Sequence, residues 1–363
     1  MTENSYGLLG ELGWDSFFQG GFESCAISGS IPARIISEYK NSYRVRSEYD
    51  ELSVKVSGKM LYQANTGDMY PAVGDWVIVK PQVNEKKGII QAILPRKGKF
   101  SRKSAGAKTE EQVVAANVDT VFIVNGLDGG RNFNLRRVER YLTLAWNSGA
   151  FPVIVLNKMD LCPNVDDFIR SIEPVAGDVP VHPVSAMEKT GLDTLKAYIT
   201  TGKTAAFLGS SGVGKSAIIN ALLGAERQEI RAVRKGDLQG RHTTTRRELV
   251  LIPGGGAVID TPGMRELQMW ANEDNLGETF YDIDTLADNC RFNDCRHDNE
   301  PGCAVRTAIR QGTLDHGRLE SYLKLQKELR HLASREDSSI RLEEKAKWKK
   351  ISQWAKDINK QGR

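Results

Sequence analysis

Eight residues at positions 209–216, GSSGVGKS, have the composition and spacing of a phosphate-binding loop. The loop follows an apolar run at 205–208 and precedes a helix-forming run at 217–223, which is the setting that this chemistry requires. Glycines let backbone N–H groups converge on phosphate oxygens, and the helix start adds a partial positive charge. Lys215 supplies a charge for the β- and γ-phosphates, and the Ser216 hydroxyl supplies a ligand for Mg²⁺. A purely structural glycine-rich turn is the alternative interpretation.

The tetrapeptide at 157–160, NKMD, carries groups that can recognise guanine. The Asp160 carboxylate can accept hydrogen bonds from N1–H and the 2-amino group of guanine, whereas adenine has no donor at either position. The Lys158 stem can cover the base plane, and the Asn157 amide can tie this loop to the phosphate loop. After the next strand-like run, the backbone N–H of Ala186 can donate to guanine O6. The pattern therefore favours a guanine nucleotide over an adenine nucleotide.

A sensor of the γ-phosphate is expected to read D-x-x-G, and the sequence matches this pattern at three places. The matches start at Asp237, Asp260 and Asp274. Only the segment at 260–263 ends an apolar run, which would place Asp260 near Mg²⁺ and the Gly263 N–H near the γ-phosphate. The other two matches are typical of ordinary turns. The predicted nucleotide-binding residues are Asn157, Lys158, Met159, Asp160, Ser185, Ala186, Gly209, Ser210, Ser211, Gly212, Val213, Gly214, Lys215, Ser216, Ala217, Asp260 and Gly263.

A second cluster of chemically capable residues lies near the C-terminus and has the composition of a metal site. Its members are Cys290, Cys295, His297 and Cys303. Three thiolates and one imidazole form a closed set with no position left for water, so we predict one structural Zn²⁺ in tetrahedral coordination. Five cysteines are few and odd in number for a disulfide framework. Two buried cysteines beside an unrelated pair are the alternative interpretation.

The elements that must position these residues change character along the 363-residue chain. Residues 1–29 are glycine-rich and are expected to be a loosely attached N-terminal arm. Between 31 and 104, short strand-like runs separated by turns predict an all-β, OB-like barrel, with a five-stranded sandwich as the alternative. From about residue 115, continuous apolar strands alternate with helices, which indicates an α/β domain with a mainly parallel sheet. Beyond the cysteine cluster, a mixed-charge segment predicts a helical extension.

Five segments together resemble the five motifs of a Ras-like GTPase, but in the order fourth, fifth, first, second, third. They are NKMD at 157–160, SAM at 185–187, GSSGVGKS at 209–216, GRHTTT at 240–245 and DTPG at 260–263. With a barrel before them and the cysteine cluster after them, they resemble the bacterial ribosome small-subunit-dependent GTPase A family. Such a circular permutation is tolerated because the termini of a domain often lie close together.

The resemblance implies a domain organisation and a function. It implies an N-terminal arm at 1–29, an RNA-binding barrel at 30–110, a circularly permuted P-loop GTPase domain at 111–270, and a zinc-binding module with C-terminal helices at 271–363. The implied activity is hydrolysis of GTP to GDP and phosphate, stimulated by the small ribosomal subunit during its late maturation. The implied partners are GTP with Mg²⁺, GDP, the small subunit with its rRNA, and other assembly factors, for a cytoplasmic monomer.

The group that runs hydrolysis is not obvious from the sequence. Ras-like enzymes place a water-orienting glutamine directly after D-x-x-G, where this chain has Met264, and a thioether cannot orient water. The resemblance makes His242 the candidate catalytic residue, and a solvent-exposed loop histidine is the alternative. It also implies that one of the threonines at 243–245 joins Ser216 and Asp260 as a Mg²⁺ ligand; the sequence does not distinguish the three, and Thr244 is our candidate. The rival function is an RNA-binding scaffold with a non-hydrolysing structural GTP site.

Charge and hydropathy exclude some functions and leave others open. Fifty Lys and Arg against 46 Asp and Glu give a net charge of +4, too mild by itself to indicate nucleic-acid binding. The run at 96–103, RKGKFSRK, interleaves an aromatic residue with cations and suits an RNA backbone with a stacked base, although a solvated charge run is the alternative. No apolar run has the length of a membrane span, so no membrane partner is expected.

Overall fold

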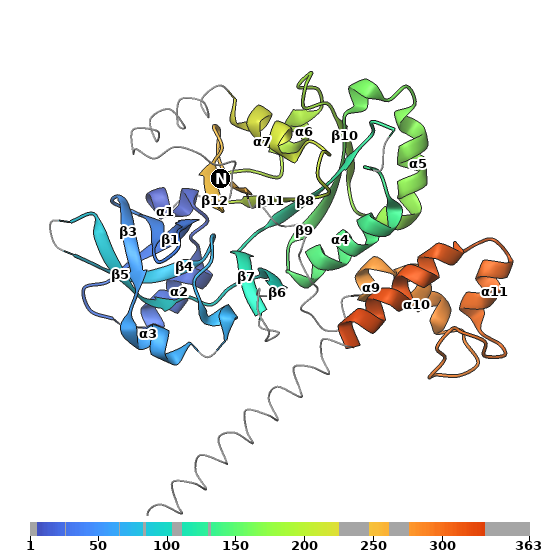
Figure 1. The fold of residues 1–363 in the computed structure, drawn as a ribbon, viewed down its shortest axis with the longest axis horizontal. Coiled ribbons are helices and arrows are strands. Elements are labelled where there is room, and N and C mark those ends of the chain that lie inside the picture. The colour runs from blue at the N-terminus through green and yellow to red at the C-terminus, as the bar shows by residue number, and fades with distance from the viewer. Residues whose placement is uncertain are drawn as a thin grey trace, which may run out of the picture. The chain divides into compact units, whose positions relative to one another are not determined.

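The structure, a computed structural model, describes residues 6–25, 27–64, 66–82, 85–103, 111–129, 132–224, 247–260 and 276–330. The chain divides into two compact units, Met1–Gln268 and Met269–Arg363. The first unit holds a barrel and an α/β domain, and the second is helical (Figure 1). Within the described part of the chain, no helix combines the length and apolar character needed to cross a membrane.

Five strands close into a barrel near the N-terminus. They are β1 (Ile31–Glu38), β2 (Tyr43–Ser47), β3 (Glu51–Val56), β4 (Trp76–Pro81) and β5 (Lys87–Ile93). Their order is β1-β2-β3-β5-β4, and β4 pairs back onto β1, so the sheet closes on itself. β3 and β5 run parallel, and the other barrel pairs are antiparallel. The predicted OB-like barrel is therefore confirmed, and the sandwich alternative is wrong. A short helix, α3 (Gly58–Gln63), and a 3₁₀ turn, η1 (Gly67–Met69), connect β3 to β4.

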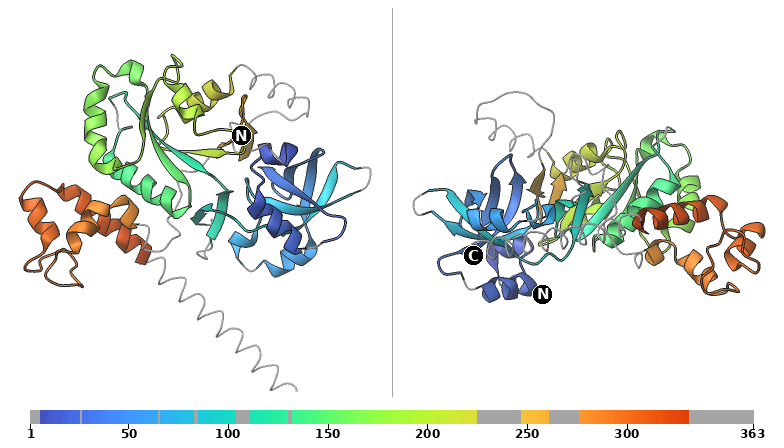
Figure 2. Two further views of the ribbon diagram at one scale, coloured as in Figure 1. Left: turned by 180° about the vertical axis from the view of Figure 1, so that it is seen from behind. Right: turned by 60° about the horizontal axis from the view of Figure 1, so that its bottom comes forward.

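The N-terminal segment packs on the barrel through two helices, α1 (Gly7–Glu11) and α2 (Ser16–Cys25). Leu9, Leu12, Trp14 and Phe18 are buried in one cluster with Trp76 and other barrel residues. The rings of Trp14 and Trp76 meet edge to face with centroids 4.7 Å apart. Figure 2 shows both helices against the barrel wall. The expectation of a loosely attached arm was wrong, because the few aromatic residues among its glycines cover an apolar face of the barrel.

The α/β domain has a six-stranded sheet in the order β10-β9-β8-β11-β13-β12. The strands are β8 (Thr120–Gly126), β9 (Phe151–Asn157), β10 (Val181–Val184), β11 (Thr204–Leu208), β12 (Glu248–Leu251) and β13 (Ala257–Asp260). All neighbours pair in parallel except β12 and β13. The mainly parallel sheet is as predicted. β12 also pairs with β1 through Ser37 and Glu248, so this sheet is continuous with the barrel.

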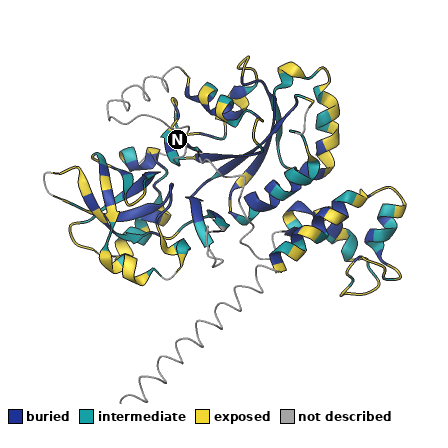
Figure 3. Cartoon of the chain, viewed as in Figure 1, coloured by how far each residue is buried: buried dark blue, intermediate teal, exposed yellow. Residues whose placement is uncertain are grey.

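Helices cover both faces of the α/β sheet. Phe122 and Val124 share a core cluster with residues of α6 (Leu192–Lys196) and α7 (Lys215–Leu223). Residues at alternate positions of the same strand point to the opposite face, where α4 (Leu135–Asn147) and α5 (Val165–Ala176) lie (Figure 1). β8 is buried along its whole length, and Figure 3 shows the central strands as the most buried part of the domain. A 3₁₀ turn, η2 (Met159–Leu161), follows β9.

A two-stranded sheet joins the barrel to the α/β domain. It pairs β6 (Lys99–Lys103) with β7 (Glu111–Ala116), neither of which was predicted. The close approach at Gly74 explains a glycine there, because its φ is +93° and a Cβ atom would lie 2.1 Å from the carbonyl oxygen of Ala116. β7 leads directly into β8, so the sheet connects the two parts without a free linker.

The second unit is built from short helices around an aromatic core. These are α9 (Leu276–Thr279), α10 (Tyr281–Ala287) and α11 (Ala304–Arg310), and residues 316–330 are also helical. The Arg318 guanidinium makes two charged hydrogen bonds to Asp282, at 2.6 and 2.7 Å, and lies over the Phe280 ring. These contacts fix the helix at 316–330 against α10.

Candidate nucleotide and metal sites

The predicted nucleotide loops meet at one edge of the α/β sheet. They follow β9, β10 and β11, which run parallel, so their carboxyl ends share that edge. The Asn157 amide donates to the carbonyl oxygen of Val213 at 2.8 Å, and its own oxygen accepts from the Ala186 N–H at 3.1 Å. Asn157 is 2% exposed. One buried side chain therefore ties together three loops that are far apart in the sequence.

The phosphate loop has the backbone conformation that its glycines allow. Gly212 and Gly214 have φ of +82° and +96°, in the left-handed region. At Gly214, a Cβ atom would lie 2.1 Å from the Asn157 side-chain nitrogen. Val213 between them is fully buried and anchors the loop. Glycine at 214 is thus required both by the backbone and by the approach of Asn157.

Lys215 folds over the phosphate loop. Its ammonium donates to the carbonyl oxygens of Gly209 and Ser210, at 2.7 and 2.6 Å. The Arg137 guanidinium, from α4, donates to the Ser210 hydroxyl. Two cations therefore lie at a loop whose backbone N–H groups can bind an anion.

The base-recognition loop is held by two contacts. Lys158 adopts a left-handed conformation with φ +67°, and its ammonium pairs with Asp128. The hydrogen bond from Lys158 lowers the pKa of Asp128, which also accepts from Asn132 at 3.0 Å. The buried Ser185 hydroxyl donates to the exposed Asp160 carboxylate at 2.5 Å. These bonds orient the lysine stem and the carboxylate before any base is bound.

Sequence reasoning missed Asp128, Asn132 and Arg137. All three follow β8, whose carboxyl end lies between those of β9 and β11. The signal was available, because polar residues directly after a buried strand at this edge are well placed to contact a ligand. The sequence does not give the strand order, however, so no sequence pattern showed that these residues lie near the loops at 157–160 and 209–216.

Some of the other residues predicted for nucleotide and Mg²⁺ binding lie in the part of the chain that the structure describes, and the others lie outside it. Asp260 is the last residue of β13, and Ser216 is the second residue of α7, with an exposed side chain. His242, Thr244, Gly263 and Met264 lie outside the described residues.

The comparisons with known proteins agree with this arrangement. Residues 93–270 match the family described as RsgA GTPase. The chain is 45% identical to the small ribosomal subunit biogenesis GTPase RsgA of Opitutus terrae over 95% of its own length and 96% of that protein. The chain belongs to the RsgA GTPase family. It is also 46% identical to the RsgA 2 protein of Lactiplantibacillus plantarum, over 83% of this chain and 84% of the relative.

Solved structures show the same permuted fold. YjeQ from Thermotoga maritima covers 83% of this chain and 98% of its own, with 29% identity and a TM-score of 0.61. YloQ, titled a circularly permuted GTPase, covers 84% of this chain and 96% of its own, with 25% identity and a TM-score of 0.58. The family predicted from the motif order is confirmed, and the chain is an RsgA-type GTPase, a hydrolase that acts on GTP.

The cysteine cluster forms a compact ligand set in the second unit. The ligand atoms of Cys290, Cys295, His297 and Cys303 all lie within 4.8 Å of one another. The Cys290 and Cys303 sulfurs are 3.9 Å apart, and they lie 3.7 and 3.5 Å from Nδ1 of His297. A tetrahedral site with Zn–S bonds of about 2.3 Å has sulfur–sulfur edges of about 3.8 Å. The four side chains therefore fit one tetrahedral metal ion.

The surroundings of the cluster shift the pKa values of its members in different directions. Burial lowers the pKa of His297, which keeps its imidazole neutral. Burial alone would raise the pKa of Cys290, but hydrogen bonds from the backbone N–H groups of Ala304 and Val305, together with those from Cys295 and Cys303, lower it. Burial raises the pKa of Cys295 to about 11 in the metal-free cluster. A bound cation would deprotonate that thiol.

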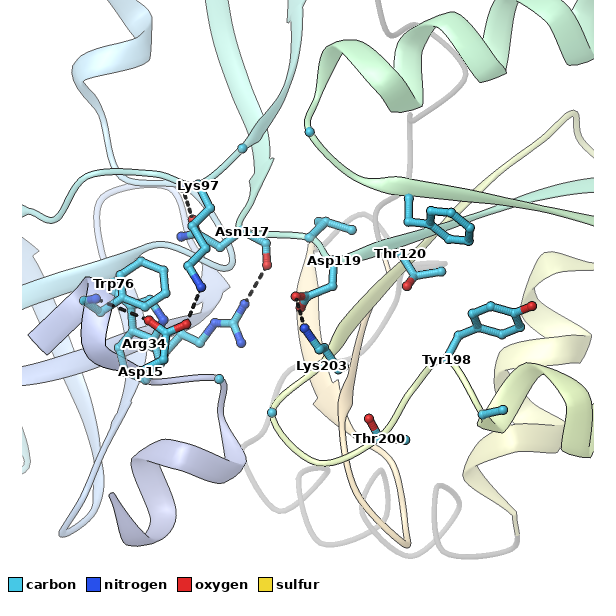
Figure 4. Close-up of a pocket in the computed structure, with 18 residues that line it drawn as sticks. Asp15, Arg34, Trp76, Lys97, Asn117, Asp119, Thr120, Tyr198, Thr200 and Lys203 are labelled. Carbon is cyan, nitrogen blue, oxygen red and sulfur yellow. Dashed lines mark hydrogen bonds and ion pairs between the residues drawn. The ribbon is translucent and has the colours of Figure 1, made fainter. Parts of the chain in front are cut away.

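A cavity of about 460 Å³ lies between the barrel and the α/β domain, at the opposite sheet edge from the nucleotide loops. Figure 4 shows Arg34 and Lys97 on the barrel side facing Asp119 and Lys203 on the other. These groups already have partners: Lys97 pairs with Asp15, Asp119 pairs with Lys203 at 3.1 Å, and Arg34 donates to the Asn117 carbonyl at 3.1 Å. Burial lowers the pKa of Arg34 to about 10. The cavity is a polar junction that joins the two parts.

Cations in the basic run at 96–103 already form ion pairs within the protein. Arg96 pairs with the fully buried Asp75 at 2.7 Å, and Lys99 pairs with Glu111 at 2.9 Å. Phe100 is 3% exposed, so its ring cannot stack on a base. The expectation of a stacking aromatic at this position was wrong, because Phe100 is buried in β6, where it lies opposite Ala115 of β7.

Proposed function

We propose that this protein hydrolyses GTP on the small ribosomal subunit and assists late maturation of that subunit. The nucleotide part is supported by the two hydrogen bonds that the Asn157 side chain makes with Val213 and Ala186, which hold the loops at 157–160, 185–187 and 209–216 together. The ribosomal part is supported by the names of relatives that share at least 45% identity with this chain. Hydrolysis would release the protein, and with it other assembly factors, from the subunit.

Each nucleotide residue has a proposed role. Asp160 accepts from guanine, with Ser185 orienting its carboxylate, and the Lys158 stem covers the base. The Ala186 N–H serves guanine O6, shared with the bond that it now makes to Asn157. The Lys215 ammonium donates to loop carbonyl oxygens in the structure, and in the nucleotide complex it would donate to the β- and γ-phosphates instead. The remaining proposed contacts come from Met159, Ala217, Gly263 and the loop at 209–216.

Metal ions have two proposed places. Ser216 and Asp260, with Thr244, would hold Mg²⁺, because hydroxyl and carboxylate oxygens are the ligands that this ion prefers. Bound Mg²⁺ would offset charge on the phosphate oxygens. Cys290, Cys295, His297 and Cys303 would hold one structural Zn²⁺, since the set has no open position. His242 remains the proposed catalytic residue.

Partners and location follow from the proposed work on ribosomal subunits. The barrel and the zinc module would contact rRNA, and the chain would act as a monomer in the cytoplasm. Exposed aromatic side chains such as Tyr49 and Tyr62 on the barrel are available for base stacking, unlike Phe100.

The test is multiple-turnover phosphate release with and without purified small subunits. We expect slow turnover of the isolated protein and stimulation by about tenfold or more on adding subunits. Lys215→Ala should abolish nucleotide binding, and Lys196→Ala, an exposed lysine paired with Asp193, is the matched control. An unchanged rate with subunits would refute the ribosomal part. Turnover that never exceeds one phosphate per protein would support the non-hydrolysing scaffold, which the family match does not favour.

A further inference from the structure

The strand β12 lies between the barrel and the proposed Mg²⁺ carboxylate. In the sheet register, Ser37 of β1 is opposite Glu248 of β12, and Glu248 is opposite Asp260 of β13. Neighbouring strands are about 4.8 Å apart, so these three residues form one row across the sheet. A shift of β1 against β12 therefore acts on the strand that ends at Asp260.

An ion pair secures this junction. The Arg247 guanidinium, directly before β12, donates to the carboxylate of Glu38, the last residue of β1, at 2.8 Å. The two side chains are only 11% and 27% exposed. Solvent and salt therefore screen this pair less than an ion pair on the open surface. Tyr43 packs beside it, opposite Glu38 in the barrel, and burial raises the pKa of its hydroxyl.

β1 changes partners close to this pair. Its register with β2 shifts between Ile35 and Ser37, as in a β-bulge. A bulge bends a strand and re-aims the residues beyond it. The residues of β1 before the bulge pair with β4 to close the barrel, and Ser37 beyond it pairs with β12. One strand thus belongs to both the barrel and the GTPase sheet, and the ion pair of Glu38 with Arg247 lies where β1 leaves the barrel and pairs with β12.

We propose that Glu38 and Arg247 are positioning residues that couple the barrel to Asp260, so that RNA bound to the barrel alters the rate of GTP hydrolysis. The RNA in this statement rests on the proposed function. Because β1, β12 and β13 are paired in one sheet, we also expect the nucleotide bound beside Asp260 to alter the barrel strand β1. That second consequence needs no ribosome and can be measured on the isolated chain.

The first experiment is amide hydrogen exchange of the full chain with GDP or with a non-hydrolysable GTP analogue. We expect exchange in β1 to be slower with the analogue, and exchange in β5, which does not pair with β1, to be unchanged. Glu38→Gln and Arg247→Gln should each reduce the β1 difference, and the charge exchange E38R with R247E should restore it. Glu51→Gln removes an ion pair to Arg46 inside the barrel and is the matched control.

The second experiment measures turnover with saturating small subunits. Loss of either charge should lower the stimulated kcat by about threefold to tenfold, a typical range for residues that carry coupling, with KM within about twofold. The charge exchange should recover the lost kcat, which a merely structural role would not do. Thermal unfolding of each variant shows whether the fold is kept, and the charge-exchanged chain keeps the test valid if a single variant is unstable.

The outcomes separate the coupling from the proposed function. The coupling is refuted if amide hydrogen exchange in β1 of the unmodified chain is the same with either nucleotide. It is also refuted if the double variant E38R/R247E restores neither the β1 difference in hydrogen exchange nor the kcat. If β1 responds and the variants abolish the response, but subunits never stimulate the unmodified chain, the coupling stands and the ribosomal function falls.

Discussion

The side-chain amide of Asn157 donates to the backbone carbonyl of Val213 at 2.8 Å, across 56 positions of sequence. Both residues are buried, and the bond joins the loop that we propose reads the base to the loop that we propose binds phosphate. In this chain the loop at 157–160 precedes the loop at 209–216, and the bond from Asn157 holds the two loops together directly.

Replacing Asn157 should damage both stability and nucleotide binding. Asn157→Ala leaves the Val213 carbonyl and the Ala186 N–H unpaired in a buried place, which costs about 1–3 kcal/mol for each group. We expect the free energy of unfolding to fall and the Kd for GDP to rise, measured by urea unfolding and by nucleotide fluorescence titration. Asn157→Asp keeps the acceptor for Ala186 and loses the donor to Val213, so it separates the two bonds. Unchanged affinity in both variants would contradict this role.

Asp160 should decide which base is bound. Xanthine has a carbonyl where guanine has the 2-amino group, so an amide at 160 can accept from N1–H and donate to that carbonyl. Asp160→Asn should weaken GTP binding by about 10²-fold or more and improve binding of xanthosine triphosphate, because a site built to hydrogen-bond one base strongly rejects a base that leaves those groups unpaired. Competition binding with both nucleotides measures the change. Ser185→Ala, which removes only the hydrogen bond to Asp160, should weaken GTP binding without reversing the preference.

Removing the metal should unfold the second unit and spare the first. Structural Zn²⁺ supplies about 10–16 kcal/mol in small zinc domains, so Cys303→Ser or a chelator should abolish its helical signal in circular dichroism. The nucleotide loops belong to the other compact unit, so the Kd for GDP should stay within about twofold. Cys162→Ser, outside the cluster, is the control. A full complement of zinc in the Cys303→Ser protein would show that the cluster is not the site.

His182 should make stability fall in mild acid. Burial lowers the pKa of His182 below its ordinary value of about 6.5, and its ring nitrogen lies 2.9 Å from the Tyr198 hydroxyl. The unfolded chain then binds a proton more readily, so the contribution of His182 is complete above about pH 6.5 and is lost as the pH falls toward the folded pKa. Urea unfolding at pH 7.5 and 5.5 should show a smaller decline in His182→Gln than in the unmodified chain. Equal declines would argue against it.

Local motifs predicted much of the site because their chemistry is short-range. The loop at 209–216 and the tetrapeptide at 157–160 each carry their own backbone donors, charges and flanking strand. The cysteine cluster likewise spans only 290–303. Strand and helix positions in the α/β domain were predictable for a related reason, since buried parallel strands are continuously apolar.

Contacts between distant segments needed the tertiary structure. Asp128 and Arg137 contact the nucleotide loops only because β8 lies between β9 and β11, and strand order is not written in a local pattern. Phe100, which lies among cations in the sequence, was expected to be an exposed stacking residue, but in the structure it is a buried residue of β6.

The amino-acid sequence alone therefore determined the family of this protein, through the order of its motifs, and predicted which groups would hold guanine, phosphate and a tetrahedral metal. Only the tertiary structure decided that the N-terminal helices cover the barrel, and that Glu38 and Arg247 join the barrel to the strand beside Asp260. The reason is physical. A loop motif acts over a few residues, whereas burial and ion pairing depend on which surfaces the whole fold brings together.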